Sequence, residues 1–192
     1  MATISRIQPY WAGNSLNATE PLFHGGPEAL HWKETASQSY GVGDLLYLDT
    51  NGTIAICTLT GTIHNSAIIG QAITAATGTT GASVFLRVIR PDDLFVMNVT
   101  HTTVASAVTV QTLLGLRKGL QKLVSCWGAD IENAVEGAAD ALARVKIVDF
   151  PLRSPSGETV AIGDVLGLVL VNFVPFSMAS DGNPNQFVLQ GA

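Results

Sequence analysis

The sequence is short of charge. Of its 192 residues, 10 are Lys or Arg and 15 are Asp or Glu, so that 13% are charged. An ordinary soluble domain carries roughly 25%. A folded monomer of this mass exposes about 8,700 Å² by the usual scaling of surface with mass, which leaves roughly one charge per 350 Å². Three conditions explain such a deficit: a membrane around the protein, an unusually large core, or a surface covered by other subunits.

Long apolar runs are also missing. A membrane-spanning helix needs about 20 consecutive apolar residues, whereas the longest apolar stretch, Val165 to Val171, stops at Asn172. No charged-then-apolar leader opens the sequence, so we expect no secretory signal and no membrane partner. A large core fits a chain of this length but does not explain the missing surface charge. Coverage by other subunits is therefore the explanation that we develop.

Basic charge and cysteine are scarce as well. The net charge of −5 and the sequence pI near 5.2 exclude the basic patch that nucleic-acid binding needs, so we expect no nucleic-acid partner. The two cysteines, Cys57 and Cys126, lie far apart in the sequence and lack the spacing of a metal site. We expect both to be reduced core residues.

Motifs for chemistry are absent from the sequence. The histidines show no His-x-His spacing, and Gly78-Thr-Thr-Gly81 lacks the Gly-Lys-Ser/Thr ending of a phosphate-binding loop. The neighbouring acids Asp92 and Asp93 follow Pro91 between two apolar runs, which is typical of solvated turn residues. We therefore expect no catalytic residue, no metal and no cofactor, and a protein that is not an enzyme.

Residues 1–40 differ in composition from the rest. Prolines and glycines interrupt them and no helical or strand period persists, yet they hold five of the chain's aromatic residues, namely Tyr10, Trp11, Phe23, Trp32 and Tyr40. Disordered segments are usually poor in aromatics. We interpret residues 1–40 as an extended N-terminal arm whose aromatics pack either on its own domain or on a neighbour.

From Gly41 the sequence consists of short apolar runs between turn signals. Asn51-Gly52 between Leu45–Leu48 and Thr53–Leu59 is a strong hairpin signal, because both residues tolerate positive φ. Further β-branched runs follow at 67–73, 84–89, 94–99, 144–150 and 165–174. Such spacing is typical of a barrel or sandwich. We predict a mainly β fold, a small β-barrel or β-sandwich of short antiparallel strands, with one β-rich domain over residues 41–192.

Residues 102–143 interrupt this pattern and form an insertion of uncertain structure. Alternation over 104–110 suits a strand, whereas 113–124 fits either a strand or a helix interrupted by glycines. An apolar stripe at helical spacing, with Asp130 as its N-cap, predicts one short helix near 131–143.

The run 165–174 is apolar on both faces, and such a strand must be buried on both. We expect the core on one side and another subunit on the other. Interfaces are rich in aromatic anchors. The predicted partner interface therefore combines the arm and this strand, and comprises Tyr10, Trp11, Phe23, Trp32, Val169, Val171 and Phe173.

The order of the motifs resembles a known family. Gly43-Asp44-Leu-Leu-Tyr-Leu, Asn51-Gly-Thr-Ile, Ile68-Ile-Gly-Gln-Ala and Val84-Phe-Leu-Arg-Val-Ile-Arg-Pro follow one another as in the small β-domain of tailed-bacteriophage head decoration (cement) proteins. Val145-Lys-Ile-Val-Asp-Phe and the strand to Phe173 are similar to the closing strands of that domain.

The resemblance implies a structural protein of the virion that is assembled in the host cytoplasm. It would bind the major capsid protein on the outer surface of the capsid, often as a homotrimer, and bridge coat subunits. The N-terminal arm would reach along the coat surface. Two alternatives stay open: a β-barrel ligand- or carbohydrate-binding module of a viral surface assembly, with exposed Trp and Tyr in a groove, and an enzyme with a dispersed site.

Overall fold

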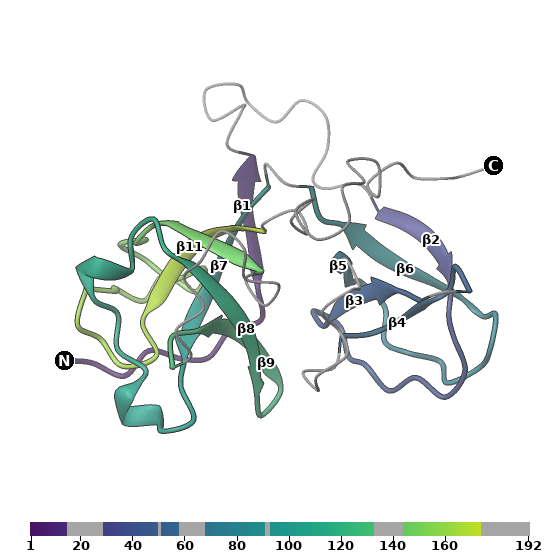
Figure 1. Ribbon diagram of the computed structural model, residues 1–192, viewed down its shortest axis with the longest axis horizontal. Helices are drawn as coiled ribbons and strands as arrows, with labels where there is room; N and C mark the ends of the chain where they lie inside the picture. Colours follow the sequence, from purple (N-terminus) through teal and green to yellow (C-terminus); the bar gives the residue numbers. More distant parts are fainter. Residues whose placement is uncertain (15–28, 50, 58–67, 91–92, 133–143, 174–192) are drawn as a thin grey trace.

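The computed structural model describes residues 1–14, 29–49, 51–57, 68–90, 93–132 and 144–173. These residues form two β-sheets and two single-turn 3₁₀ helices, so that the prediction of a mainly β fold is confirmed (Figure 1). Within the described residues, no helix has the length and apolar character to cross a bilayer.

The larger sheet contains a closed barrel. Its strand order is β1-β7-β11-β10-β8-β9, and β9 also pairs in parallel with β7, so that five strands form a ring with β1 attached outside it. One edge of β7 pairs with β11. The other edge pairs with β1 over its first half and with β9 over its second half. The strands are β1 (Tyr10–Asn14), β7 (Asp93–Thr100), β8 (Arg117–Leu123), β9 (Cys126–Asp130), β10 (Val145–Asp149) and β11 (Leu168–Phe173).

The second sheet, called here the small sheet, has the order β2-β6-β5-β3-β4. Its two end strands approach each other at one end, where Glu34 forms an isolated bridge with Ile54. The predicted Asn51-Gly52 hairpin joins β3 to β4, and Gly52 has φ +74°. The strands are β2 (Ala29–Lys33), β3 (Leu45–Leu48), β4 (Ile54–Ile56), β5 (Ile68–Ala72) and β6 (Ser83–Val88).

Strand β11 is buried on both faces, as its composition predicts, but its own chain supplies both covers. Val169, Val171 and Phe173 lie in the barrel core, at 0%, 0% and 5% exposure. Leu168 on the other face packs with Ile4 near the N-terminus. The prediction that Val169, Val171 and Phe173 contact a partner is therefore corrected, because enclosed side chains offer a partner no surface.

The described parts of the N-terminal segment lie on their own chain. Ile4 donates its backbone N–H to the carbonyl of Val165 (2.9 Å), and the Ile7 N–H donates to Asn98 Oδ1 (2.8 Å). Strand β1 then pairs with β7, and β2 pairs with β6. Packing on the arm's own domain was one of the two alternatives left open by the sequence. Phe23 lies outside the described residues.

The middle segment departs from one prediction. Residues 104–110 do not form a strand: the 3₁₀ helix η2 (Val104–Ser106) lies in this stretch, η3 (Gln111–Leu113) follows it, and Val108 makes only an isolated bridge. Residues 117–123 adopt the strand alternative. Of the predicted helix, Ile131 and Glu132 are not helical, and 133–143 lie outside the described residues. The Asp130 carboxylate accepts the Glu132 N–H (2.9 Å).

A shared core joins the two sheets. Leu45 and Cys57 of the small-sheet half lie in one apolar cluster with Trp127 of the barrel. Asp44, only 3% exposed, accepts a hydrogen bond from Trp127 Nε1 (3.0 Å) and forms an ion pair with Lys122 (2.5 Å). These contacts connect β3 directly to the β8–β9 hairpin of the barrel.

Candidate interaction surfaces

The aromatic side chains predicted to meet a partner do not gather in one place. Tyr10 is 54% exposed on β1, whereas Trp11 on the same strand packs against the barrel core and donates its Nε1–H to Asp93 (3.2 Å). Trp32 lies on β2 of the small sheet, and Trp127 is 1% exposed. The described tryptophans are thus dispersed and do not line a common groove.

Folding removes further charge from the surface. Five acidic side chains are buried, whereas Lys118 is the one buried base among the described residues. A buried carboxylate is stable only when it accepts hydrogen bonds. In this protein the donors include backbone N–H groups of loops, which the buried acids hold in place. Asp164, for example, accepts the backbone N–H groups of Ala2 (2.7 Å) and Ala161 (2.9 Å), which lower the pKa of its carboxyl. The buried acids are Glu34, Asp44, Asp93, Asp130 and Asp164.

Two neighbouring loops beside the small sheet form an uncharged surface, called here the small-sheet end. It comprises residues 35–43 and 73–82, which contain no Asp, Glu, Lys or Arg. Ala76 N donates to Tyr40 O (2.9 Å) and joins the loops, and Gly43 N donates to Ala72 O (2.8 Å) at the end of β5. Val42 is 62% exposed there and Ile73 is 37% exposed.

The buried side chain of Glu34 holds one loop of this surface in place. Its carboxylate, 0% exposed, accepts the backbone N–H groups of Thr77 (2.9 Å) and Gly78 (2.8 Å) and the Thr77 hydroxyl (3.0 Å). The glycine-rich stretch Gly78-Thr-Thr-Gly81 is therefore a loop held by a buried acid, and both of its glycines have φ +74°. Burial, and then the charge of Glu34, raise the pKa of nearby Tyr40 to about 12.

A second uncharged surface, the barrel end, comprises residues 102–116 and 160–163. No Asp, Glu, Lys or Arg occurs in either segment. Gly163 N donates to Thr109 O (2.9 Å), which holds the segments side by side. The exposed apolar side chains are Val104 (39%), Val110 (44%), Leu114 (45%) and Ile162 (49%).

The two uncharged surfaces lie on the two halves of the molecule. In Figure 1 the 3₁₀ turns of the barrel end lie at the far left, in the barrel half. The small-sheet end belongs to the other half and reaches back to the junction, since a Cβ on Gly43 would lie 2.8 Å from Gln8 Cγ. The shared core and the Asp44 contacts join the halves between them. The protein therefore presents two separate surfaces that are poor in charge, on one packed body.

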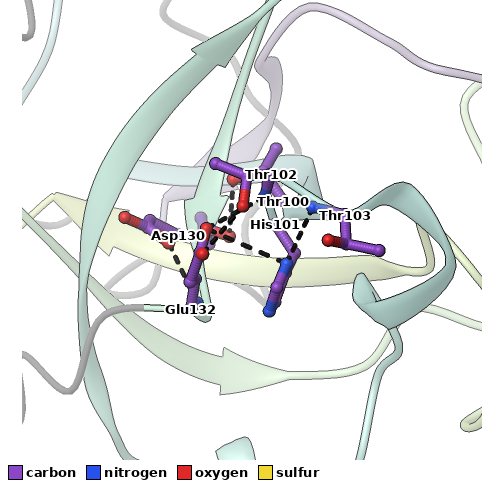
Figure 2. A network of polar contacts seen from close by, with 7 residues as sticks. Thr100, His101, Thr102, Thr103, Asp130 and Glu132 are labelled. Atoms are coloured by element: carbon purple, nitrogen blue, oxygen red, sulfur yellow. Dashed lines mark hydrogen bonds and ion pairs between the residues drawn. The ribbon is translucent and has the colours of Figure 1, made fainter.

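A polar network borders the barrel end. Figure 2 shows His101, Thr102 and Thr103 after β7 facing Glu132 after β9. Glu132 accepts the Thr102 N–H (2.9 Å) and hydroxyl (2.7 Å), which lower the pKa of its carboxyl. His101 Nδ1 accepts the Thr103 N–H (3.0 Å) and lies 3.8 Å from Glu132. The network, which Asp130 joins by accepting the Glu132 N–H, ties the start of the barrel end to β9. Among the described residues, no group of three His, Cys, Asp or Glu side chains could hold a metal ion.

A shallow pocket of about 260 Å³ lies on the small sheet, lined by His31, Trp32, Lys33 and Ser83. Trp32 is half-buried beside it, with its Nε1–H donated to the carbonyl of Gly52 (2.9 Å). Of the predicted interface residues, Tyr10 is exposed, and Trp11 and Trp32 are partly buried and keep some accessible surface. The two uncharged ends were missed as surfaces, although runs without charged residues mark both in the sequence.

Comparison of the chain with protein-family models, with curated proteins and with solved structures gives no match.

Proposed function

We propose that this chain is a structural capsid decoration (cement) protein. It binds the outer surface of a phage head and stabilises the assembled shell by bridging coat subunits. The observation that carries the proposal is the pair of uncharged surfaces, the barrel end and the small-sheet end, on the two halves of one packed body (Figure 1). The order of motifs that resembles decoration proteins supports it independently.

Both surfaces have the composition of an interface. Cores of protein interfaces are depleted of charged residues, and removing water from an unpaired charge is costly. The barrel end offers Val104, Val110 and Leu114, each partly exposed on a hydrogen-bonded loop. The small-sheet end offers Val42 and short hydroxyl side chains. A body with one such surface on each half would contact two neighbouring subunits at once, as bridging requires.

Self-association completes the proposal. As the resemblance to decoration proteins implies, we expect the copies to associate as a homotrimer on the shell. Three linked copies bind the shell more tightly than one, because each contact raises the effective concentration for the next. The alternative of a carbohydrate-binding module receives less support, since the described tryptophans are dispersed and Trp127 is buried.

Co-sedimentation with purified undecorated phage heads tests the proposal. Val110→Glu and Val42→Glu each place a charge on one end, at positions 44% and 62% exposed where folding tolerates it. We expect each to weaken binding by about tenfold or more, equivalent to about 1.4 kcal/mol. Val124→Glu is the matched control, because Val124 is 88% exposed at the tip of the β8–β9 hairpin, outside both ends.

Two results would contradict the proposal. Wild-type protein that stays in the supernatant removes the capsid as a partner, and end variants that pellet like Val124→Glu remove the uncharged ends as its binding surfaces. Light scattering during size exclusion tests the trimer separately: a mass near three times 20.1 kDa is expected. A stable monomer that also fails to pellet with heads would refute the whole account.

A further inference from the structure

Strand β2 is the end strand of the small sheet. It pairs with β6 through five consecutive residues, from Ala29 opposite Arg87 to Lys33 opposite Ser83, without a bulge. Proteins usually protect such an edge with a proline, a bulge or charged side chains, especially lysine, because its free backbone groups can bind another strand. Residues 29–33 contain no proline, and Lys33, at the end of the strand, is their one protecting charge.

The hydrogen-bond pattern identifies which backbone groups face outward. In an antiparallel pair, successive residues direct their N–H and C=O alternately toward and away from the partner. Glu34 N donates to Ala82 O on the β6 side, whereas Thr35 N donates to Ile54 O on the opposite side. His31 and Lys33 lie four and two residues before Thr35. Because the direction alternates along the strand, their backbone groups also face away from β6.

The backbone of Phe85, which lies opposite His31, supports the same orientation of His31. Phe85 N donates to Thr74 Oγ1, and Phe85 O accepts from Ile73 N, so the backbone groups of Phe85 face β5. Phe85 and His31 therefore form a non-hydrogen-bonded pair, which leaves the N–H and C=O of His31 on the outer edge. At the end of this edge, Thr35 N donates to Ile54 O of β4. Among the described residues, no backbone partner is found for His31 and Lys33 on the outer side of β2.

The side chains beside this edge favour one kind of partner. Exposure alternates along β2, so that His31 and Lys33 lie on the outer face. The His31 ring lies on Phe85, which is 41% exposed, with ring centroids 3.9 Å apart. Neither β2 nor β6 carries an acidic residue, while Lys33 and Arg87 both have basic side chains. An acidic side chain complements Lys33, and an apolar one covers Phe85.

We propose that β2 binds an extended acidic segment of a partner protein by strand addition. The segment forms backbone hydrogen bonds to His31 and Lys33, places a carboxylate beside Lys33 Nζ, and occupies the 260 Å³ pocket along the edge. This inference goes beyond the proposed function and does not depend on it. A peptide and the protein alone test it, without phage heads.

The test uses a ten-residue peptide of alternating Glu and Val, with an alternating Lys and Val peptide as the charge control. Labelled Glu-Val peptide should bind saturably in fluorescence anisotropy, and the Lys-Val peptide at least tenfold more weakly. Binding should also slow hydrogen exchange of the His31 and Lys33 amides tenfold or more. Equal affinity for both peptides, or unchanged exchange of these amides, would overturn the proposal.

Two variants locate the binding edge. His31→Pro removes an outward N–H, a change that edge strands tolerate, and should abolish peptide binding. Lys33→Glu keeps the backbone and should weaken binding tenfold or more. Lys146→Glu is the matched control, because Lys146 is exposed on β10, which is paired on both sides by β8 and β11.

The results separate the two proposals. Binding that survives both His31→Pro and Lys33→Glu would overturn strand addition at β2. Quenching of Trp32 fluorescence by free glycans that the peptide does not displace would also overturn strand addition, because the pocket would then hold a sugar. Phage-head binding by His31→Pro would leave the proposed function intact, whatever the peptide result.

Discussion

Replacement of Asp44 by Ala should strongly destabilise the fold, because this carboxylate links the two halves. Asp44 is 3% exposed. Its Oδ1 accepts the Trp127 Nε1–H (3.0 Å) and lies 2.5 Å from Lys122 Nζ, and its Oδ2 accepts the Gly41 N–H (2.9 Å). Alanine leaves the buried indole N–H without its acceptor and the ammonium without its counter-charge.

The magnitude follows from these contacts. Breaking a buried ion pair by removing one partner costs about 3–5 kcal/mol, and hydrogen bonds to a charged group contribute about 1.5–3 kcal/mol each. The Lys122 side chain is 23% exposed and can turn toward water, which places the expected loss near the lower limit, at about 3 kcal/mol. Asp44→Asn keeps an acceptor for Trp127 and should lose less, about 1.5 kcal/mol, the lower limit for one hydrogen bond to a charged group.

Urea denaturation followed by tryptophan fluorescence measures this loss. With a slope of about 2–3 kcal/mol per M, the Asp44→Ala midpoint should fall by about 1 M or more. Asp149→Ala, an exposed acid on β10, is the control and should shift the free energy of unfolding by less than about 0.5 kcal/mol. An Asp44→Ala variant as stable as Asp149→Ala would refute the role given to this junction.

Three further predictions follow from the packing and the ionisable groups. Gly128→Ala should cost about 1–3 kcal/mol in thermal unfolding, because its Cβ would lie 2.5 Å from the Asn98 carbonyl oxygen. The pKa of Asp164 is lower in the folded state than in the unfolded chain, so its contribution to stability is present above about pH 5. That contribution should disappear as the pH falls below about 4, in acid unfolding curves. Burial raises the pKa of the Cys57 thiol to about 12, so a thiol reagent at pH 8 should label Cys126 and leave Cys57 unmodified until the protein unfolds.

Each of these predictions has a control and a contrary result. Gly41→Ala meets no atom within 4 Å and should be nearly neutral, so equal losses for Gly41 and Gly128 would contradict the packing argument. Asp164→Asn should flatten the acid limb of the stability curve, and an unchanged limb would show that other carboxyls control it. Rapid labelling of both cysteines in the native state would contradict the burial of Cys57.

The local part of the fold could be predicted from the sequence. Asn51-Gly52 marks the β3–β4 hairpin, and the apolar runs at 84–89 and 94–99 correspond to β6 and β7. These elements depend on turn chemistry and on alternation of side chains, which neighbouring residues determine.

The β8–β9 hairpin could not be recognised, because its turn, Val124-Ser125, contains no Gly, Asn, Asp or Pro. Val124 stands there with φ +60° and 88% exposure, a conformation in which a β-branched residue is rare. The closure of the barrel by the parallel β7–β9 pair was also hidden, since it joins segments about 30 residues apart through backbone bonds that leave no local pattern.

The candidate surfaces were predicted in part. The interpretation of the charge deficit as surface covered by partners stays a prediction. Apolarity on both faces of β11 was assigned to a partner, whereas Ile4 and its neighbours provide the second cover. A strand buried by another subunit and one buried by a distant segment of its own chain have the same composition. Only tertiary structure distinguishes them.

Saturable sedimentation of the wild-type protein with undecorated phage heads tests the central claim most directly. The account predicts a fixed number of bound copies per head, and a loss of that binding when Val42→Glu and Val110→Glu are combined. Wild-type protein that pellets no more than the combined variant would contradict it.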